Sequence, residues 1–172
     1  MRKKSITASE LVERLERDPD YRARRAQQDA ASAEKAALCA ADEKQLVSEI
    51  RALGYDIDSV YDLVNNTPHP VLPRRFFGPY PRAYPILVRH LHLEHHRAIR
   101  EGVIRSLTVR DGGVPVEKAL LDEFDRETDQ HLRWVLASAL KTAVPYSKRR
   151  RRPDIAATFR AGGRLKLPAR VD

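Results

Sequence analysis

The sequence predicts an all-α protein, and three features of the chain support this prediction. The stretch from Tyr21 to Leu53 has no proline or glycine and is rich in alanine, arginine, glutamate and glutamine, which favours one long helix. Residues 83–144 match themselves at a shift of 33 residues, an offset typical of a two-helix structural repeat. Charged residues make up 33% of the 172 residues and aromatic residues only 6%, a composition that favours long, solvated helices.

The N-terminal part, residues 1–53, is predicted to be a helical extension. Thr7 and Glu10 have the spacing of a capping box, so a short helix is expected to begin after Thr7. Pro19 interrupts that helix, because proline is not tolerated in a helix interior. The long helix that follows is expected to end at Gly54. The apolar residues of its first half are mostly alanines, which can bury little apolar surface. We therefore expect that half to project from the body or to bind a partner.

Residues 54–145 are predicted to form the main helical domain. The domain begins with a short helix after Ser59, which stops near Asn65, and continues into a proline-rich connector at residues 67–85. Six prolines make this connector extended and rather rigid. Its aromatic residues are expected to anchor it to the body, and the alternative is a peptide-like ligand segment.

Four helices in two hairpins are predicted after the connector. The first hairpin comprises residues 83–93 and 94–109, and the second comprises residues from 115 or 116 to 127 and from 128 to about 144. A glycine-containing turn joins the two hairpins. The positions that match between them are Leu87 and Leu120, Val88 and Leu121, Leu91 and Phe124, Ile99 and Leu132, Arg100 and Arg133, Val103 and Leu136, and Leu107 and Leu140.

The two hairpins resemble HEAT repeats of the armadillo-type α-solenoid. The pattern is a proline at the first helix, an apolar pair, a polar turn, and then an apolar residue followed by arginine. In the first unit it is carried by Pro85-Ile-Leu87, Leu91, Ile99-Arg100, Val103 and Leu107. In the second unit it is carried by Leu120-Leu121, Phe124, Asp129, Leu132-Arg133, Ala137 and Leu140. The resemblance, which extends loosely over residues 8–66 to bacterial HEAT-repeat proteins of unassigned function, implies a short α-α superhelix.

The first unit departs from the HEAT pattern at two places. Gly102 occupies the position that Val135 holds in the second unit, and His95-His96 replaces the usual turn with aspartate, which the second unit keeps as Asp129. Two units are also fewer than the three or so that a solenoid needs. The N-terminal helices are therefore expected to cap one end, and the other end is either open or covered by residues 153–160.

Almost all of the net charge of +8 lies in residues 146–172, which hold nine basic and two acidic side chains and are predicted to be a basic, partly disordered tail. Five consecutive cations there could neutralise phosphate groups and bind nucleic acid without reading its sequence. A solvated tail or a contact with an acidic protein stays open as an alternative. The five cations are Lys148, Arg149, Arg150, Arg151 and Arg152.

No sequence pattern predicts catalysis, a cofactor or a metal. The stretch from His90 to His96 contains four histidines and Glu94, but HExxH and HxxEH are absent and a helix–helix turn is expected within it. Solvated histidines are therefore the expectation. Cys39 stands among alanines on a predicted helix, which suggests a packing residue and not a thiolate nucleophile.

The repeated arginines Arg100 and Arg133 are predicted to be structural ties between the hairpins. Trp134 is predicted to be a core or inter-repeat packing residue, with a place on a binding surface as the alternative.

The expected function is that of a non-catalytic scaffold that binds another protein or its own copy through the solenoid groove and the long N-terminal helix. The alternative is a nucleic-acid-associated protein held by the basic tail. No apolar run approaches the roughly 20 residues that cross a bilayer, and the N-terminus lacks a signal-peptide core. We therefore expect no membrane partner and a cytoplasmic location.

Overall fold

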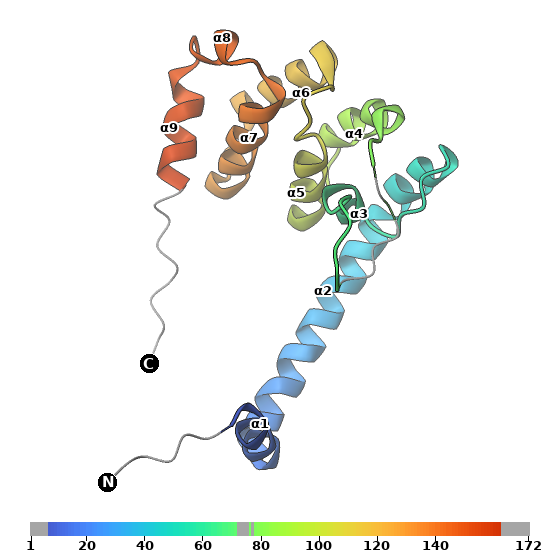
Figure 1. Ribbon diagram of the computed structural model, residues 1–172, viewed down its shortest axis with the longest axis vertical. Coiled ribbons are helices and arrows are strands. Elements are labelled where there is room, and N and C mark those ends of the chain that lie inside the picture. Colours follow the sequence, from blue (N-terminus) through green and yellow to red (C-terminus); the bar gives the residue numbers. More distant parts are fainter. Residues whose placement is uncertain (1–6, 72–75, 77, 163–172) are drawn as a thin grey trace. The chain divides into compact units, whose positions relative to one another are not determined.

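The computed structural model describes residues 7–71, 76 and 78–162, and all regular structure within them is helical (Figure 1). The predicted fold class is confirmed: a long N-terminal helix is followed by shorter helices. The chain divides into two compact units, Met1–Ala40 and Ala41–Asp172. The predicted boundary lay at residue 53. The division falls earlier because the last part of the long helix buries Leu46, Val47 and Ile50 in the second unit.

The first unit contains α1 (Ala8–Arg17) and the first part of α2 (Pro19–Ala52). The predicted capping box is present, because the Glu10 amide donates to Oγ1 of Thr7 at 3.3 Å and the Thr7 amide donates to the Glu10 carboxylate at 2.9 Å. Oδ1 of Asp18 accepts from the Asp20 amide at 2.9 Å. Pro19 therefore begins α2, in the first turn where a missing N–H costs nothing.

The second unit begins with the end of α2, which leads into α3 (Val60–Val64). Gly54 lies just past α2 with a φ of +89°, as expected for a glycine that terminates a helix. The buried carboxylate of Glu43 in α2 accepts from the Ser59 hydroxyl and from the Val60 amide, both at 3.0 Å. These two bonds attach the start of α3 to α2.

Two helical hairpins form the centre of this unit. The first consists of α4 (Tyr84–Leu91), preceded by the 3-10 turn η1 (Pro81–Ala83), and α5 (Arg97–Ser106). The second consists of α6 (Gly113–Arg126) and α7 (Gln130–Ala143). Helix α4 packs on α6, and α5 packs on both α3 and α7. The hairpins therefore stack with like helices together, and their apolar faces form one core. Its fully buried members include Leu87, Leu91, Ile99, Leu107, Leu120, Phe124, Leu136 and Leu140.

The aromatic residues of the proline-rich connector lie against the folded body. Phe76 meets Tyr55 edge to face with ring centroids 5.4 Å apart, and Tyr80 contacts both Phe76 and Tyr84 in the same manner. The Tyr80 hydroxyl donates to the Ser106 carbonyl at 2.8 Å and ties the connector to α5. Phe77 lies outside the described residues.

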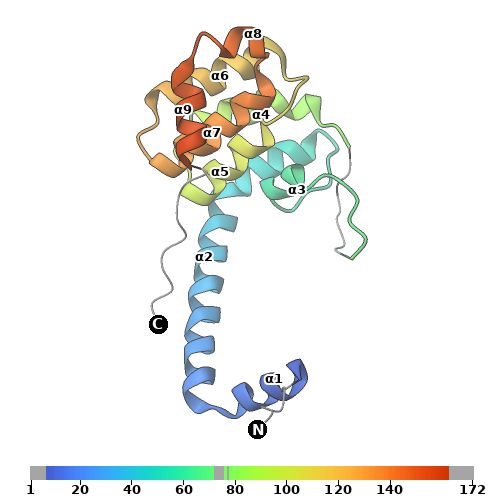
Figure 2. The same cartoon turned by 60° about the vertical axis from the view of Figure 1, so that its left-hand side comes forward.

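Residues 146–162 are folded and do not form a free tail. They contain α8 (Tyr146–Arg149) and α9 (Pro153–Gly162), and α9 lies alongside α7 in both views (Figures 1 and 2). Ile155 of α9 is buried, and the Trp134 indole N–H donates to the Phe159 carbonyl at 3.2 Å. Helix α9 therefore covers the end of the hairpin stack. The disorder predicted from about residue 161 falls mostly on residues 163–172, which lie outside the described residues.

Candidate functional site

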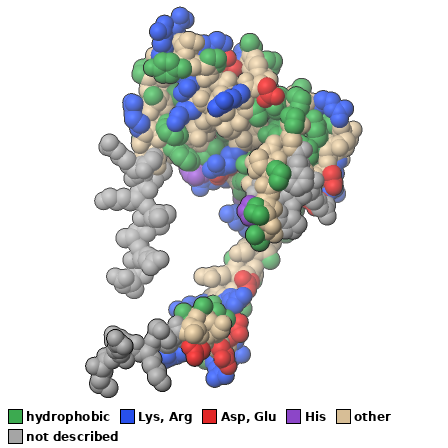
Figure 3. Space-filling model, viewed as in Figure 1, with side chains coloured by type: hydrophobic (Ala, Val, Ile, Leu, Met, Phe, Trp, Pro, Cys, Tyr) green, Lys and Arg blue, Asp and Glu red, His purple; other side chains and the backbone are tan. Residues whose placement is uncertain are grey.

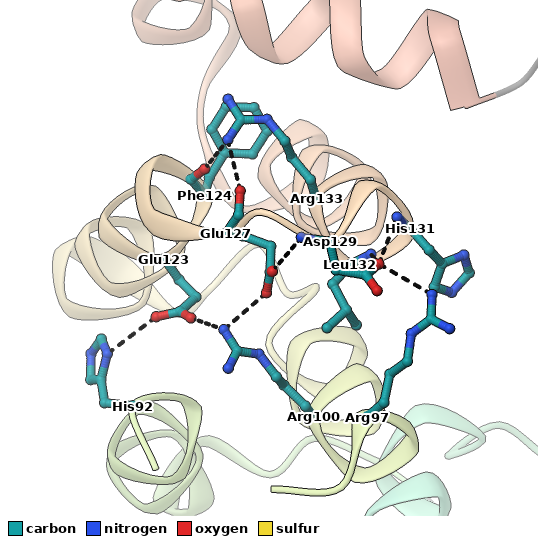
Figure 4. A network of polar contacts seen from close by, with 10 residues as sticks. All are labelled: His92, Arg97, Arg100, Glu123, Phe124, Glu127, Asp129, His131, Leu132 and Arg133. Atoms are coloured by element: carbon teal, nitrogen blue, oxygen red, sulfur yellow. Dashed lines mark hydrogen bonds and ion pairs between the residues drawn. The ribbon is translucent and has the colours of Figure 1, made fainter. Parts of the chain in front are cut away.

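An ion cluster joins the two hairpins; we define it as His92, Arg100, Glu123 and Glu127 (Figure 4). The guanidinium of Arg100 in α5 lies between the Glu123 carboxylate and the Glu127 carboxylate, the latter at 2.9 Å. Both acidic side chains are buried, with 7% and 8% of their surfaces exposed. Nδ1 of His92 lies 3.5 Å from Glu123. Arg100 thus neutralises two carboxylates that have left water.

Arg133 occupies the matching position in the second hairpin but binds carbonyl groups instead. It donates to the carbonyl oxygens of Phe124 at 2.7 Å and Glu127 at 3.2 Å, and its guanidinium lies 4.2 Å from the centroid of the Phe124 ring (Figure 4). These are the unpaired carbonyls at the end of α6. Arg133 therefore ties the end of α6 to α7.

Asp129 caps α7 at the same junction. Its Oδ1 accepts from the amides of His131 at 2.8 Å and Leu132 at 3.0 Å, and it pairs with Arg97 of α5 at 3.1 Å. The Leu132 amide, with the further help of the His131 amide and Arg97, lowers the pKa of the Asp129 carboxyl. Asp129 is therefore ionised at neutral pH and links both hairpins.

A row of four polar side chains lies where α2 meets the α4–α5 turn; we call Asp42, Glu49, His90 and His95 the histidine row. Glu49 Oε2 lies 3.1 Å from Nε2 of His90, whose Nδ1 lies 3.0 Å from Nε2 of His95. Nδ1 of His95 then lies 3.0 Å from Oδ2 of Asp42. His90 is only 2% exposed and the side chain of His95 6% exposed, so the expectation of solvated histidines is wrong for these two.

The two carboxylates of the histidine row belong to α2, and nothing in the sequence around the histidines indicates them. They lie 53 and 41 positions from their imidazole partners. The packing of α2 on the first hairpin brings them together. Within the described residues, no group of three or more His, Cys, Asp or Glu side chains is arranged to hold a metal ion.

The five cations of the predicted phosphate-binding run do not act alike. Lys148 pairs with Glu117 at 2.8 Å, Arg149 donates to the Val144 carbonyl at 2.8 Å, and Arg152 binds Asp125 and Asp154. Three of the five are therefore used to attach residues 146–162 to the body. The remaining two, Arg150 and Arg151, are exposed, and no ion pair engages either of them within the described part of the chain.

Trp134 lies at the contact between α7 and α9. Its ring is parallel to that of Phe159, with an interplanar angle of 11° and centroids 6.3 Å apart, and Nζ of Lys141 lies 3.5 Å from the centroid of Phe159. The Trp134 ring is partly exposed and lines a shallow hollow of about 310 Å³ beside α9.

A second hollow, of about 550 Å³, lies between α3, the connector, the α5–α6 loop and α7. Its polar groups include Arg105, Arg110 and the phenols of Tyr80 and Tyr84. Burial raises the pKa of Tyr80 to about 12. Burial, together with the hydrogen bond to Asp111, raises the pKa of Tyr84 further. Both phenols stay protonated at neutral pH and donate to Ser106 and Asp111, so neither hydroxyl is a general base.

Comparison with protein-family models, with curated proteins and with solved structures found no match. Within the described residues, no helix is long and apolar enough to cross a membrane.

Proposed function

We propose that this chain is a non-catalytic, HEAT-like scaffold that binds a partner helix through the first unit. The stacked hairpins, tied by Arg100 and Arg133 and capped by α3 and α9, support the rigid scaffold. The observation that carries the proposal is the first unit, in which no described side chain is buried. A helix that buries little apolar surface is marginal in water, so the exposure of the described residues of this unit favours an intermolecular partner.

One face of the first part of α2 suits close approach by another helix. Six exposed alanines recur on it at alternating intervals of three and four residues, the spacing of a coiled-coil seam. Small side chains let two helix backbones come close together. The six are Ala23, Ala26, Ala30, Ala33, Ala37 and Ala40. We call this face the alanine seam.

Exposed larger residues add apolar area to this unit. Leu11 and Val12 of α1 are 49% and 52% exposed, and Leu38 of α2 is 58% exposed. Acidic and basic side chains are nearly balanced over residues 7–40, with seven and six respectively, and they are intermixed over α1 in Figure 3. Apolar contact and not net charge is therefore the expected source of affinity. The partner is a helix of another protein or of a second copy.

Replacing Ala30 and Ala33 by glutamate is expected to abolish partner binding and leave the fold unchanged. Glutamate is a good helix former at exposed positions, but two carboxylates would have to be desolvated in the seam. Analytical ultracentrifugation of the purified chain measures the mass of a complex between two copies. The same measurement on the chain recovered from nuclease-treated host lysate after cross-linking gives the mass of a complex with another protein.

The matched control replaces Gln28 and Ser32 by glutamate, which adds the same charge on another face of the same helix turns. The control is expected to keep the complex that the seam variant loses. A monomer with no stoichiometric partner, or equal loss in both variants, would contradict the proposed function.

Nucleic-acid binding through the basic run is the second candidate, supported by the exposure of Arg150 and Arg151. Deleting residues 146–172 does not test this candidate cleanly, because the deletion also removes α9 from its packing on α7.

Replacing Arg150 and Arg151 by glutamate tests the basic run and leaves α9 in place. If the run binds phosphate, the slope of log affinity against log salt concentration should become shallower by about 0.9 for each phosphate that the variant no longer neutralises. Retention of labelled DNA and RNA at several salt concentrations measures this slope. Equal retention by the wild-type chain and the variant, or none by the wild-type chain at low salt, would remove this candidate.

A further inference from the structure

The carboxylates of the histidine row determine where its imidazole protons lie. An ionised carboxylate only accepts hydrogen bonds, so Glu49 requires a proton on Nε2 of His90 and Asp42 requires one on Nδ1 of His95. The other nitrogen of each ring then carries a lone pair in the neutral form. Those two nitrogens are the pair that face each other at 3.0 Å.

The rings meet edge to edge. Their centroids are 5.2 Å apart while the facing nitrogens are 3.0 Å apart, and the ring planes differ by only 22°. The nitrogens therefore lie between the two rings, close to the line that joins the centroids. Two neutral imidazoles would place lone pair against lone pair, whereas one additional proton makes an N–H···N hydrogen bond at this distance.

We propose that the histidine row holds one extra proton between its two imidazoles and is a proton-sensitive latch between α2 and the α4–α5 turn. The inference goes beyond the proposed function and does not depend on it. A charged imidazole that donates to both Asp42 and His90 gives all four ring nitrogens of the row a hydrogen-bond partner. Loss of the proton sets two lone pairs against each other in a site with little access to water.

The surroundings keep the extra proton off His90. Burial is the largest influence on His90 and, with Arg89 nearby, it lowers the pKa of that imidazole although the Glu49 carboxylate acts to raise it, so His90 is the neutral ring. Arg89 binds the same oxygen of Glu49 that faces His90, whereas the Gln45 amide donates to the other oxygen and lowers the pKa of that carboxyl. Among the residues that the structure describes, the groups that face the row are Gln45 and Lys44 from α2, Arg89 from α4 and the backbone N–H of His96, which donates to Asp42 at 2.9 Å.

The latch makes stability depend on pH in both directions. Counted beyond the one N–H proton of each neutral ring, the folded row holds one extra proton. Two unfolded histidines with a pKa of about 6.5 hold two extra protons in acid and none in alkali. Below that pH the unfolded chain binds more protons, so stability rises with pH; above it the folded chain binds more, so stability falls. The contribution of the row is therefore largest near about pH 6.5.

Nitrogen NMR of the imidazoles in the full chain tests the proposal without a substitution. At about pH 7, one buried ring should show two protonated nitrogens and the other only one. The proton between the rings should exchange slowly with solvent. The ring signals of His69, which is exposed and lies outside the row, serve as an internal reference. Two neutral buried rings at that pH, or two buried rings that titrate together near the ordinary value, would overturn the proposal.

Urea unfolding of His95→Gln at several pH values gives the second test, with His69→Gln as the control. The midpoint of His95→Gln should fall furthest below that of the wild-type chain near about pH 6.5, and His69→Gln should follow the wild-type chain. A constant difference across pH would overturn the latch. Stabilisation of the wild-type chain by added Zn²⁺, absent in His95→Gln, would assign the row to a metal and overturn it as well.

Discussion

Replacing Arg100 by alanine is expected to destabilise the second unit by about 3 kcal/mol, since removal of one partner leaves buried charge uncompensated. Glu123 and Glu127 are almost fully buried and both face its guanidinium, so two carboxylates would lose their counterion at once (Figure 4). The value lies at the lower end of the range for buried pairs because the Arg100 side chain is 25% exposed. Urea unfolding followed by circular dichroism measures it.

Arg97→Ala is the matched control, one helical turn away on α5. Its ion pair with Asp129 is largely solvated, with side chains 58% and 37% exposed, so its loss is expected to cost about 0–1 kcal/mol. Adding Glu123→Gln to Arg100→Ala should recover part of the loss, because it removes one of the two stranded charges. Equal midpoints for Arg100→Ala and Arg97→Ala would show that the ion cluster does not tie the hairpins.

Replacing Gly102 by valine is expected to destabilise the second unit by about 3 kcal/mol through overpacking. A Cβ at this position would lie 2.5 Å from Cγ1 of Val60 and 3.2 Å from Cε2 of Tyr61, so α3 would have to move away from α5. Helix propensity acts the other way, because glycine is the poorer helix former. Thermal or urea unfolding measures whether the substitution lowers or raises the stability of the second unit.

The Gly102→Val variant tests whether the matching position in the other hairpin or the local contact with α3 decides which residue is tolerated here. Valine is the natural residue at the matching position, Val135, so equivalence of the two hairpins predicts that the substitution is tolerated. The contact with α3 predicts that it is not. Val60→Ala in the same chain should restore part of the stability by making room for the new side chain. Unchanged stability of Gly102→Val would mean that α3 does not pack closely on α5.

The proposed function and the latch rest on different residues and fail separately. The alanine seam lies in the first unit, whereas the histidine row lies entirely in the second. A chain that binds no partner helix could still hold the shared proton, and the NMR experiment would show it. Conversely, two neutral imidazoles would leave the test of the seam unaffected.

Local signals predicted the elements well. The capping box of Thr7 and Glu10 and the long helix that ends before Gly54 are both present. These signals depend on residues three or four positions apart, which a helix places together whatever the tertiary structure. Residues 153–160 were one of the two alternatives for the far end of the hairpins, and α9 covers residues 153–162 there.

The role of individual charged residues was less predictable. A run of five cations suggested one phosphate-binding strip, yet three of the five bind Glu117, Asp125, Asp154 and a carbonyl of the same unit. The four histidines suggested a solvated loop, yet two of them are buried against α2. Which charges stay free depends on how distant helices pack.

The sequence by itself determined the all-α class, the order of the helices and the two matching hairpins, because periodicity, caps and prolines act over a few residues. The tertiary structure alone decided which surfaces remain free and which polar groups meet. The His90–Glu49 and His95–Asp42 contacts join residues 41 and 53 positions apart. Such pairs leave no local pattern in the chain, since only the packing of α2 on the first hairpin brings them within hydrogen-bonding distance.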